Sequence, residues 1–249
     1  MELELIQQHQ KKIRDCQTCD GTGYRLDKSG KSVPHDCLIE ALYDVRLSQS
    51  GIPPRFKNLA FKDYMYQNST TFAKIWKYLD KAELAVEYGH GLFLYGPKNS
   101  GKTMLGCCII KELMHKGYDS GFVTFSGLMS NHIEAEKFVG KDKTFACIDN
   151  ISSVLDRLVN FTETNLTHQL SNGAVNQLTD VLSARIMRNQ PTILTSDVSI
   201  KEISEDKRFS GLGNLLVGSF EPVECVVGDF RGERTRDRLA QEFGFDQVE

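Results

Sequence analysis

From Phe56 onward, short apolar runs alternate along the chain with longer stretches that have helical periodicity. The apolar runs have the length of buried strands. Alternation of this kind is typical of a parallel sheet whose faces are covered by helices. The sequence therefore predicts an α/β domain with strands at 91–95, 121–125, 144–148, 191–195 and 223–227.

Two helices between these strands are defined by their apolar positions. The stretch 103–116 has apolar residues at 104, 105, 108, 109, 110 and 113, and it ends before Gly117, a residue suited to a helix C-terminus. The stretch 174–189 places apolar side chains on one face, at positions 175, 178, 181, 182 and 186. The interval 152–171 has no readable pattern.

Residues 1–50 differ from the rest of the chain, since they combine cysteine, glycine and charged residues with little apolar periodicity. The segment Ser50-Gly51-Ile52-Pro53-Pro54 then excludes a helix, because its two prolines force an extended path. We therefore expect a small N-terminal module over residues 1–50 and a larger α/β domain over residues 51–249.

The composition is ordinary for a globular protein, with 40% hydrophobic and 25% charged residues among 249. The N-terminus lacks the apolar centre of a signal peptide and no apolar run could cross a membrane, so we expect a cytoplasmic protein without membrane contact. A net charge of −3 and a pI near 6.1 argue against binding nucleic acid over a broad basic surface, although a local patch on an oligomer stays open. The seven cysteines are not expected to form disulfides in a chain without an export signal.

A glycine-rich motif joins the predicted strand 91–95 to the predicted helix 103–116. A turn of this type directs backbone N–H groups toward phosphates at the positive end of the helix dipole, so it predicts ATP binding. The lysine of the motif would reach the β and γ phosphates, and the following threonine hydroxyl would bind Mg²⁺. A chance match on a glycine-rich turn is the alternative. The motif consists of Gly96, Pro97, Lys98, Asn99, Ser100, Gly101, Lys102 and Thr103.

Polar residues end two later strands. Asp149 follows the run 144–148 and would hold Mg²⁺ through water, although a strand-end aspartate can also begin an ordinary turn. The next residue is Asn150, whose amide can position water but cannot accept its proton, so fast ATP hydrolysis is not expected. Ser196 and Asp197 follow the run 191–195 and are candidate nucleotide contacts, with a plain strand-to-loop transition as the alternative.

Cysteine and histidine gather in the N-terminal module as two close pairs, Cys16 with Cys19 and His35 with Cys37. Three thiolates and one imidazole suit a tetrahedral structural Zn²⁺ site. Glycines at positions 21 and 23 would let the backbone turn around the metal and donate N–H groups to sulfur. A metal would also stabilise a module that has too few apolar residues to fold alone. A flexible segment with free thiols, or a redox pair, is the alternative.

Together these segments resemble the helicase-loader ATPases of the DnaC and DnaI type, and the transposon helper ATPase IstB is similar. The matching segments are Ser50 to Phe56, Gly91 to Thr103, Cys147 to Ile151, Pro191 to Asp197 and Gly228 to Arg231. The resemblance covers most of the chain, from about residue 12 to residue 231. Within these segments, Asn150 stands where the family usually has a second aspartate, and Asp197 stands where the matching segment usually ends in asparagine.

The resemblance implies an AAA+ P-loop NTPase fold with a five-stranded parallel sheet in the order 5-1-4-3-2, preceded by the zinc-binding module. It also implies self-association into a ring or spiral in the ATP state, with an arginine reaching the nucleotide of the neighbouring subunit. Arg208 is the candidate for this arginine, with a plain surface charge as the alternative, and Arg231 is a second candidate. Asn214 stands where the family has another arginine, and Gly211 and Gly213 are expected to weaken the helix there.

By the same resemblance, the chain would load a hexameric replicative helicase onto single-stranded DNA. The zinc module would contact the helicase, and ATP would act mainly as an assembly switch. One alternative is a transposition helper of the IstB kind that acts on duplex DNA. Another is an assembly factor that binds nucleotide with little hydrolysis. The expected cofactors are ATP, Mg²⁺ and Zn²⁺.

Overall fold

A parallel β-sheet forms the centre of the computed structural model, which describes residues 10–64, 69–130, 142–152 and 165–225 and the single positions 7, 137, 139 and 140. The spatial order of its five strands is β4-β5-β6-β3-β7, and every neighbouring pair is parallel. Numbered along the chain, this is the order 5-1-4-3-2 that the resemblance to AAA+ proteins implied. The strands are β3 (Gly91–Tyr95), β4 (Ser120–Thr124), β5 (Phe145–Asp149), β6 (Thr192–Ser196) and β7 (Phe220–Glu224).

Four of these five strands lie within one residue of their predicted bounds, whereas the prediction for β7 was wrong. β7 begins at Phe220, three residues before the predicted start. It is an edge strand in which only Phe220 and Val223 are buried. Because Glu221 and Pro222 are exposed, the strand lacks the continuous apolar run by which a buried strand is recognised. Pro222 itself is compatible with an edge position, where it interrupts no inner ladder.

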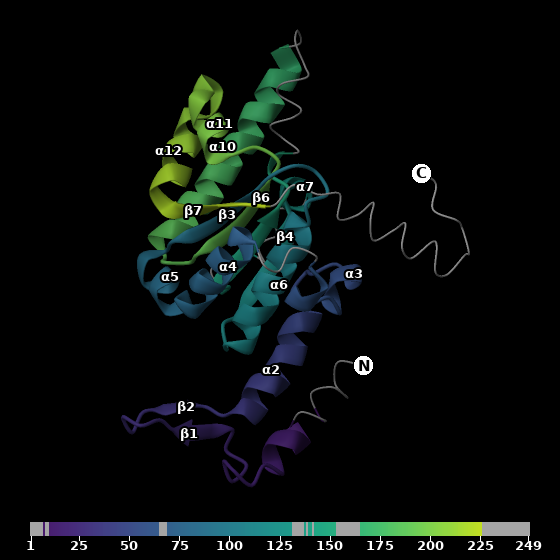
Figure 1. Ribbon diagram of the computed structural model, residues 1–249, viewed down its shortest axis with the longest axis vertical. Coiled ribbons are helices and arrows are strands. Elements are labelled where there is room, and N and C mark those ends of the chain that lie inside the picture. Colours follow the sequence, from purple (N-terminus) through teal and green to yellow (C-terminus); the bar gives the residue numbers. More distant parts are fainter. Residues whose placement is uncertain are drawn as a thin grey trace, which may run out of the picture.

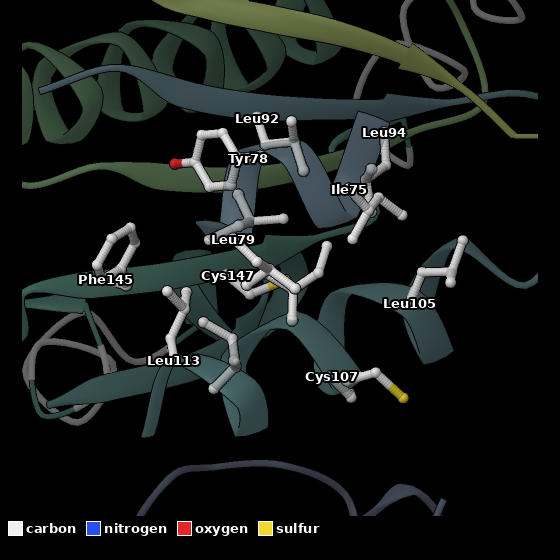
Figure 2. Packing of buried hydrophobic residues seen from close by; sticks show 14 of the residues in the cluster. Ile75, Tyr78, Leu79, Leu92, Leu94, Leu105, Cys107, Leu113, Phe145 and Cys147 are labelled. Carbon is white, nitrogen blue, oxygen red and sulfur yellow. The ribbon is translucent and has the colours of Figure 1, made fainter. Parts of the chain in front are cut away.

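Helices cover both faces of the sheet (Figure 1). Two hydrophobic cores result, one on each face, and alternate residues of a strand contribute to opposite cores. Leu92 and Leu94 belong to the first core (Figure 2), whereas Phe93 between them belongs to the second. The first core is covered by α4 (Thr70–Asp80), α5 (Ala82–Tyr88) and α6 (Lys102–His115), and the second by α7 (Phe125–Ser130), α10 (Asn165–Met187), α11 (Ile200–Glu205) and α12 (Ser210–Ser219).

The ends of the two predicted helices can be compared with the structure. α6 begins one residue before its predicted start, and the chain leaves it through Gly117, whose φ is 92°. The N–H of Tyr118 donates to the carbonyl of Leu113, so this helix ends in the glycine motif that the sequence predicts. α10 begins at Asn165, inside the interval that has no readable pattern. None of the described helices combines the length and the apolarity needed to span a bilayer.

The N-terminal module consists of an antiparallel hairpin, β1 (Tyr24–Leu26) with β2 (Ser32–Pro34), followed by α2 (Asp36–Ser48). Apolar periodicity does not predict α2, because Cys37 and Ala41 are its only buried residues. Farther along, α2 packs against the end of α6, where the rings of Tyr43 and His115 stack with their centroids 3.7 Å apart. The hairpin lies at the end of α2 that is remote from the sheet (Figure 1).

The junction between module and sheet belongs to the core. Ser50 is 0% exposed, and its carbonyl accepts the N–H of Phe122 in the edge strand β4 at 2.7 Å. Lys111 of α6 donates to the carbonyls of Phe56 and Lys57, at the end of the short helix α3 (Pro54–Lys57). A division of the chain at residue 50 stays a prediction, and the two parts are in direct contact.

One buried cation ties the end of α10 to the starts of β5 and β6. Arg185 is 2% exposed, and its Nε donates to the Thr192 hydroxyl at 2.9 Å. Its Nη1 donates to the carbonyl of Val139 at 2.7 Å, and its Nη2 donates to those of Thr144 and Pro191 at 3.3 and 3.1 Å. Because β5 and β6 carry candidate site residues at their other ends, Arg185 helps to position that site.

Candidate functional site

The predicted phosphate-binding loop connects β3 to the first turn of α6. Its backbone is left-handed at Asn99 (φ 67°) and Gly101 (φ 86°), and φ of Gly96 is 147°. A Cβ at Gly96 would lie only 2.8 Å from the carbonyl oxygen of Cys225, so glycine is required there. The loop thus has the tight path and the helix N-terminus that phosphate binding needs. Lys98 and Ser100 complete it, the first exposed and the second buried.

A tyrosine outside the motif supports this loop. The Tyr64 hydroxyl donates to the carbonyl of Ser100 at 3.2 Å, and Tyr64 is 1% exposed. Its ring also stacks on Phe72 of α4 with centroids 6.3 Å apart. The loop is therefore held from the side of the N-terminal segment as well as by its own helix.

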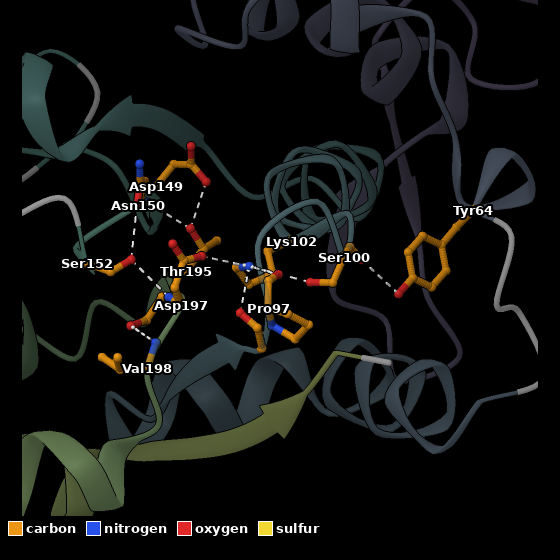
Figure 3. A network of polar contacts seen from close by, with 12 residues as sticks. Tyr64, Pro97, Ser100, Lys102, Asp149, Asn150, Ser152, Thr195, Asp197 and Val198 are labelled. Atoms are coloured by element: carbon orange, nitrogen blue, oxygen red, sulfur yellow. Dashed lines mark hydrogen bonds and ion pairs between the residues drawn. The ribbon is translucent and has the colours of Figure 1, made fainter. Parts of the chain in front are cut away.

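Lys102 is buried at the centre of the site, with 8% of its surface exposed. Its Nζ donates to the carbonyls of Gly96 at 2.9 Å and Pro97 at 2.6 Å (Figure 3). The same nitrogen lies 2.9 Å from Oδ1 of Asp197. The ammonium therefore stands over the loop, within reach of a phosphate that the loop N–H groups would bind.

The two predicted Mg²⁺ ligands come together beside Lys102. Asp149 ends β5, is 5% exposed, and accepts hydrogen bonds from the hydroxyls of Thr103 and Thr195, the latter at 2.7 Å. Burial raises the pKa of Asp149, although those hydrogen bonds and the charge of Lys102 act in the opposite direction. A buried carboxylate next to a hydroxyl offers the hard oxygen ligands that Mg²⁺ prefers, so these residues fit the ion.

Asn150 is held in a left-handed conformation at the start of the following loop, with φ 62°. Its N–H donates to the Thr195 hydroxyl at 2.7 Å, and its Oδ1 accepts the Ser152 hydroxyl at 3.1 Å. Ser152 in turn accepts the N–H of Asp197 at 2.9 Å (Figure 3). The amide oxygen at position 150 is thus tied to the ends of β5 and β6. Asparagine suits this backbone better than most residues, because it tolerates positive φ.

The residues at the end of β6 lie between the two nucleotide-binding strands, since β6 pairs with β3 on one side and with β5 on the other. Asp197 contacts Lys102, as described above. Ser196 is 0% exposed and its hydroxyl accepts the N–H of Val198 at 3.1 Å. Of the two predicted residues, Asp197 is therefore the one in contact with the loop lysine.

Arg208 lies in a short 3₁₀ turn, η2 (Lys207–Phe209). Its guanidinium forms an ion pair with the neighbouring Asp206, with Nε 3.0 Å from Oδ1, and lies 5.3 Å from the centre of the Phe209 ring. A contact of Arg208 with the nucleotide of a neighbouring subunit stays a prediction. The other candidate, Arg231, lies outside the described residues, as does the whole segment 228–231.

The glycines after Arg208 do not interrupt the helix, and whether they weaken it stays a prediction. α12 runs without interruption from Ser210 to Ser219. A Cβ at Gly213 would lie 2.7 Å from Cα of Ser204 in α11, so this glycine allows the two helices to pack closely. Asn214 is on the exposed side of α12.

The predicted zinc ligands also come together. The donor atoms of Cys16, Cys19, His35 and Cys37 all lie within 4.8 Å of one another. The sulfur atoms of Cys19 and Cys37 are 3.6 Å apart, close to the distance of roughly 3.8 Å between two thiolates at ~2.3 Å from a tetrahedral Zn²⁺. The N–H of Gly23 donates to Sγ of Cys19 at 3.3 Å, as expected for a glycine turn around a metal-bound thiolate.

The buried thiol of Cys37 stays protonated unless a cation binds beside it. Burial and the neighbouring sulfur atoms raise the pKa of Cys37 to about 12. A thiolate there needs a compensating positive charge, which Zn²⁺ would supply. None of the cysteines in the described residues forms a disulfide.

Sequence reasoning missed the residues that connect the site internally. Tyr64, Ser152 and Thr195 each donate or accept a hydrogen bond within it. Thr195 belongs to a predicted strand, and only the strand order could have shown that its hydroxyl meets Asp149. Tyr64 and Ser152 belong to no motif, so no sequence signal identifies them.

No family model and no curated protein sequence matches this chain. Several solved structures resemble its fold. A protein from Streptococcus pyogenes serotype M3, described as a candidate primosome component, is 18% identical over 76% of this chain and 97% of its own, with a TM-score of 0.52. DnaI is 17% identical over 75% of this chain and 99% of its own, with a TM-score of 0.54. The replication initiator DnaA, bound to AMPPCP and single-stranded DNA, is 14% identical over 80% of this chain and 58% of its own, with a TM-score of 0.51.

At these identities the comparisons define the fold. The order of the parallel strands, the glycine loop between β3 and α6, and the acidic end of β5 agree with that assignment. The chain therefore has the AAA+ P-loop fold.

Proposed function

We propose that this chain is an ATP-binding replication protein that loads a hexameric replicative helicase onto single-stranded DNA, with ATP acting mainly as an assembly switch. The observation that carries the proposal is the assembled loop, in which buried Lys102 stands beside Thr103 and Asp149. The similar folds of DnaI, of the primosome component and of DnaA bound to AMPPCP and single-stranded DNA support this assignment.

The loop residues have distinct roles in this proposal. The backbone N–H groups of residues 96–103 bind the phosphates, and Lys102 turns from the carbonyls of Gly96 and Pro97 toward them. Thr103 and Asp149 hold Mg²⁺, which when bound compensates phosphate charge. Each of these contacts is available without rearrangement of the sheet.

Slow turnover follows from the geometry at Asn150. An amide cannot accept a proton from water, and its Oδ1 is already hydrogen-bonded to the Ser152 hydroxyl. We therefore assign ATP binding, rather than rapid hydrolysis, as the step that changes the protein's interactions. Self-association into a ring or spiral, with Arg208 reaching a neighbouring nucleotide, is the assembly that this switch would control.

Zn²⁺ bound to Cys16, Cys19, His35 and Cys37 would stabilise the N-terminal module. The module would contact the helicase. Metal coordination would hold the hairpin against the start of α2, because Cys37 lies in the first turn of that helix. Since α2 packs on α6, a helicase bound to the module would be held in a fixed relation to the ATP-binding domain.

Loading can be tested with a covalently closed single-stranded DNA circle, onto which a hexameric ring passes only if it opens. Wild-type protein with ATP should increase the amount of helicase on the circle, and Lys102→Ala should abolish the increase. Lys81→Ala is the matched control, because it removes an exposed lysine outside the phosphate-binding loop. Binding to long duplex DNA without any helicase contact would refute loading and favour the IstB-like alternative.

An assembly factor with little hydrolysis is the second candidate, and the Asn150–Ser152 hydrogen bond favours it. The loading assay above separates the two, and steady-state phosphate release with helicase and DNA present measures how much hydrolysis contributes. Undetectable turnover, together with loss of complex formation in Lys102→Ala, would identify a binding switch. Turnover that DNA and helicase stimulate would identify an active ATPase.

A further inference from the structure

Asp197 occupies an unusual place beside the loop lysine. It follows Ser196, whose Cα partner in β3 is Tyr95, so the sheet register brings it next to Gly96. Its carboxylate is 2.9 Å from Nζ of Lys102, and its backbone N–H is fixed by the Ser152 hydroxyl at 2.9 Å. The side chain is 20% exposed and that of Lys102 is 9% exposed, so water screens the pair only in part.

This contact completes the hydrogen bonding of the lysine. An ammonium has three N–H donors. The carbonyls of Gly96 and Pro97 and the carboxylate of Asp197 all lie within 2.9 Å of Nζ, and the Ser100 hydroxyl oxygen is farther away, at 3.4 Å. A phosphate that binds Lys102 must therefore displace one of them or share the ammonium with it. The carboxylate is the strongest competitor, because a charged acceptor binds an ammonium more tightly than a neutral carbonyl.

Resting on the nucleotide site proposed above, we propose that Asp197 determines nucleotide specificity by disfavouring the terminal phosphate of ATP relative to ADP. Lysine in this kind of loop reaches the β and γ phosphates. Two acceptors that share one ammonium are at most about 6 Å apart, because each lies about 3 Å from the nitrogen. The γ-phosphate therefore enters close to the Asp197 carboxylate, and like charges at that distance repel in a partly buried site.

The charges of the buried side chains agree with this role. Asp149 and Asp197 bring two carboxylates to the site, Lys102 faces both of them, and the charge of Arg55 acts on Asp149. ATP adds one more negative charge than ADP does, at the phosphate nearest to Lys102. A neutral amide at position 197 would remove the repulsion and could donate an N–H to a phosphate oxygen.

The test is a pair of equilibrium titrations, ATP and ADP in Mg²⁺, on wild-type protein and on Asp197→Asn. The variant should bind ATP roughly tenfold more tightly and should bind ADP with a much smaller change. Asp119→Asn is the matched control, because it removes another carboxylate paired with a lysine, at 2.8 Å from Lys143, before the start of β4. It should leave both affinities unchanged. Asp197→Ala, which keeps the backbone bond to Ser152, serves as the second variant should Asp197→Asn fold poorly.

Three outcomes would overturn the inference. Equal tightening of ATP and ADP would mean that Asp197 only competes for Lys102. Weaker ATP binding in Mg²⁺, with no change in EDTA, would mean that Asp197 is a ligand of the metal. Unchanged ATP affinity would mean that the carboxylate moves away before the phosphate arrives. Wild-type protein that binds neither nucleotide would instead refute the proposed function itself.

Discussion

Substitution of Arg185 by methionine is the sharpest test of how the sheet is held in register beneath the site. Methionine keeps most of the apolar volume of the side chain and removes every donor. The arginine donates to six acceptors, the hydroxyl of Thr192 and the carbonyls of Val139, Gly140, Lys143, Thr144 and Pro191. Two of these keep another donor, because Gly140 accepts the N–H of Lys143 and Pro191 accepts that of Ala146.

Two opposing terms set the size of the effect. Burial, with the nearby charge of Arg188, lowers the pKa of Arg185 to about 9, and relief of this penalty returns at most about 5 kcal/mol. Left unpaired, the buried Thr192 hydroxyl and Val139 carbonyl cost about 3 kcal/mol each and the half-buried carbonyls of Lys143 and Thr144 about 1 kcal/mol each, or about 8 kcal/mol together. The unpaired acceptors dominate, so we expect Arg185→Met to lower the free energy of unfolding by about 3 kcal/mol.

Urea unfolding followed by circular dichroism measures this change. Arg188→Met is the matched control, because Arg188 is exposed in the turn directly after the same helix, and it should stay within about 0.5 kcal/mol of wild type. Arg185→Lys should also be destabilised, since an ammonium cannot reproduce the planar fork of a guanidinium. A decrease in the free energy of unfolding below about 1 kcal/mol for Arg185→Met would contradict the conclusion that Arg185 holds β5 and β6 in place. An equal decrease for Arg188→Met would contradict it as well.

Three further predictions concern the sites themselves. Asn150→Asp should raise ATP turnover in the presence of helicase and DNA by about tenfold or more, measured by phosphate release, because a carboxylate can accept the proton of the attacking water. Because its folded pKa is raised, protonated Asp149 contributes stability at low pH that is lost as the pH rises through that pKa. Asp149→Asn should therefore raise the thermal midpoint of the nucleotide-free protein at pH 7, with no gain at pH 3, and should abolish Mg²⁺-dependent ATP binding. Removal of the metal, or Cys16→Ser, should increase hydrogen exchange across residues 16–48 and leave ATP affinity within about twofold, since α2 contacts the end of α6 that is remote from Lys102.

The features that could be predicted from the sequence are those that depend on residues close together in the chain. The loop 96–103 combines two glycines, a lysine and a threonine within eight positions, and the same few residues determine its backbone. The zinc ligands likewise lie in two close pairs, each of which needs only a short turn to bring its donors together. Four of the strands were recognisable because they are buried on both faces and each contains a short apolar run.

The features that could not be predicted depend on contacts between segments that are far apart in the chain. Thr195 meets Asp149 only because β6 lies beside β5, and the Ser152 hydroxyl joins residues 150 and 197 for the same reason. Arg185 reaches carbonyls that are 41 to 46 positions earlier in the chain. Helix α2 was not predicted, because only one side of its C-terminal half packs against the domain. Its apolar face is therefore too narrow to give a clear periodicity.

Asn150 and Asp197 both differ from the family pattern. They follow different strands, β5 and β6, but both are proposed to affect the response to ATP. Both are joined to the Ser152 hydroxyl, so a change in the position of Asp197 alters the surroundings of Asn150 directly. When Lys102 shares its ammonium with a phosphate, its contact with Asp197 would weaken, while the Ser152 hydroxyl would still accept the backbone N–H of Asp197. In the proposed site, nucleotide binding would thereby be coupled to the loop after β5 without proton transfer. That arrangement suits a protein whose output is a change of conformation on binding ATP.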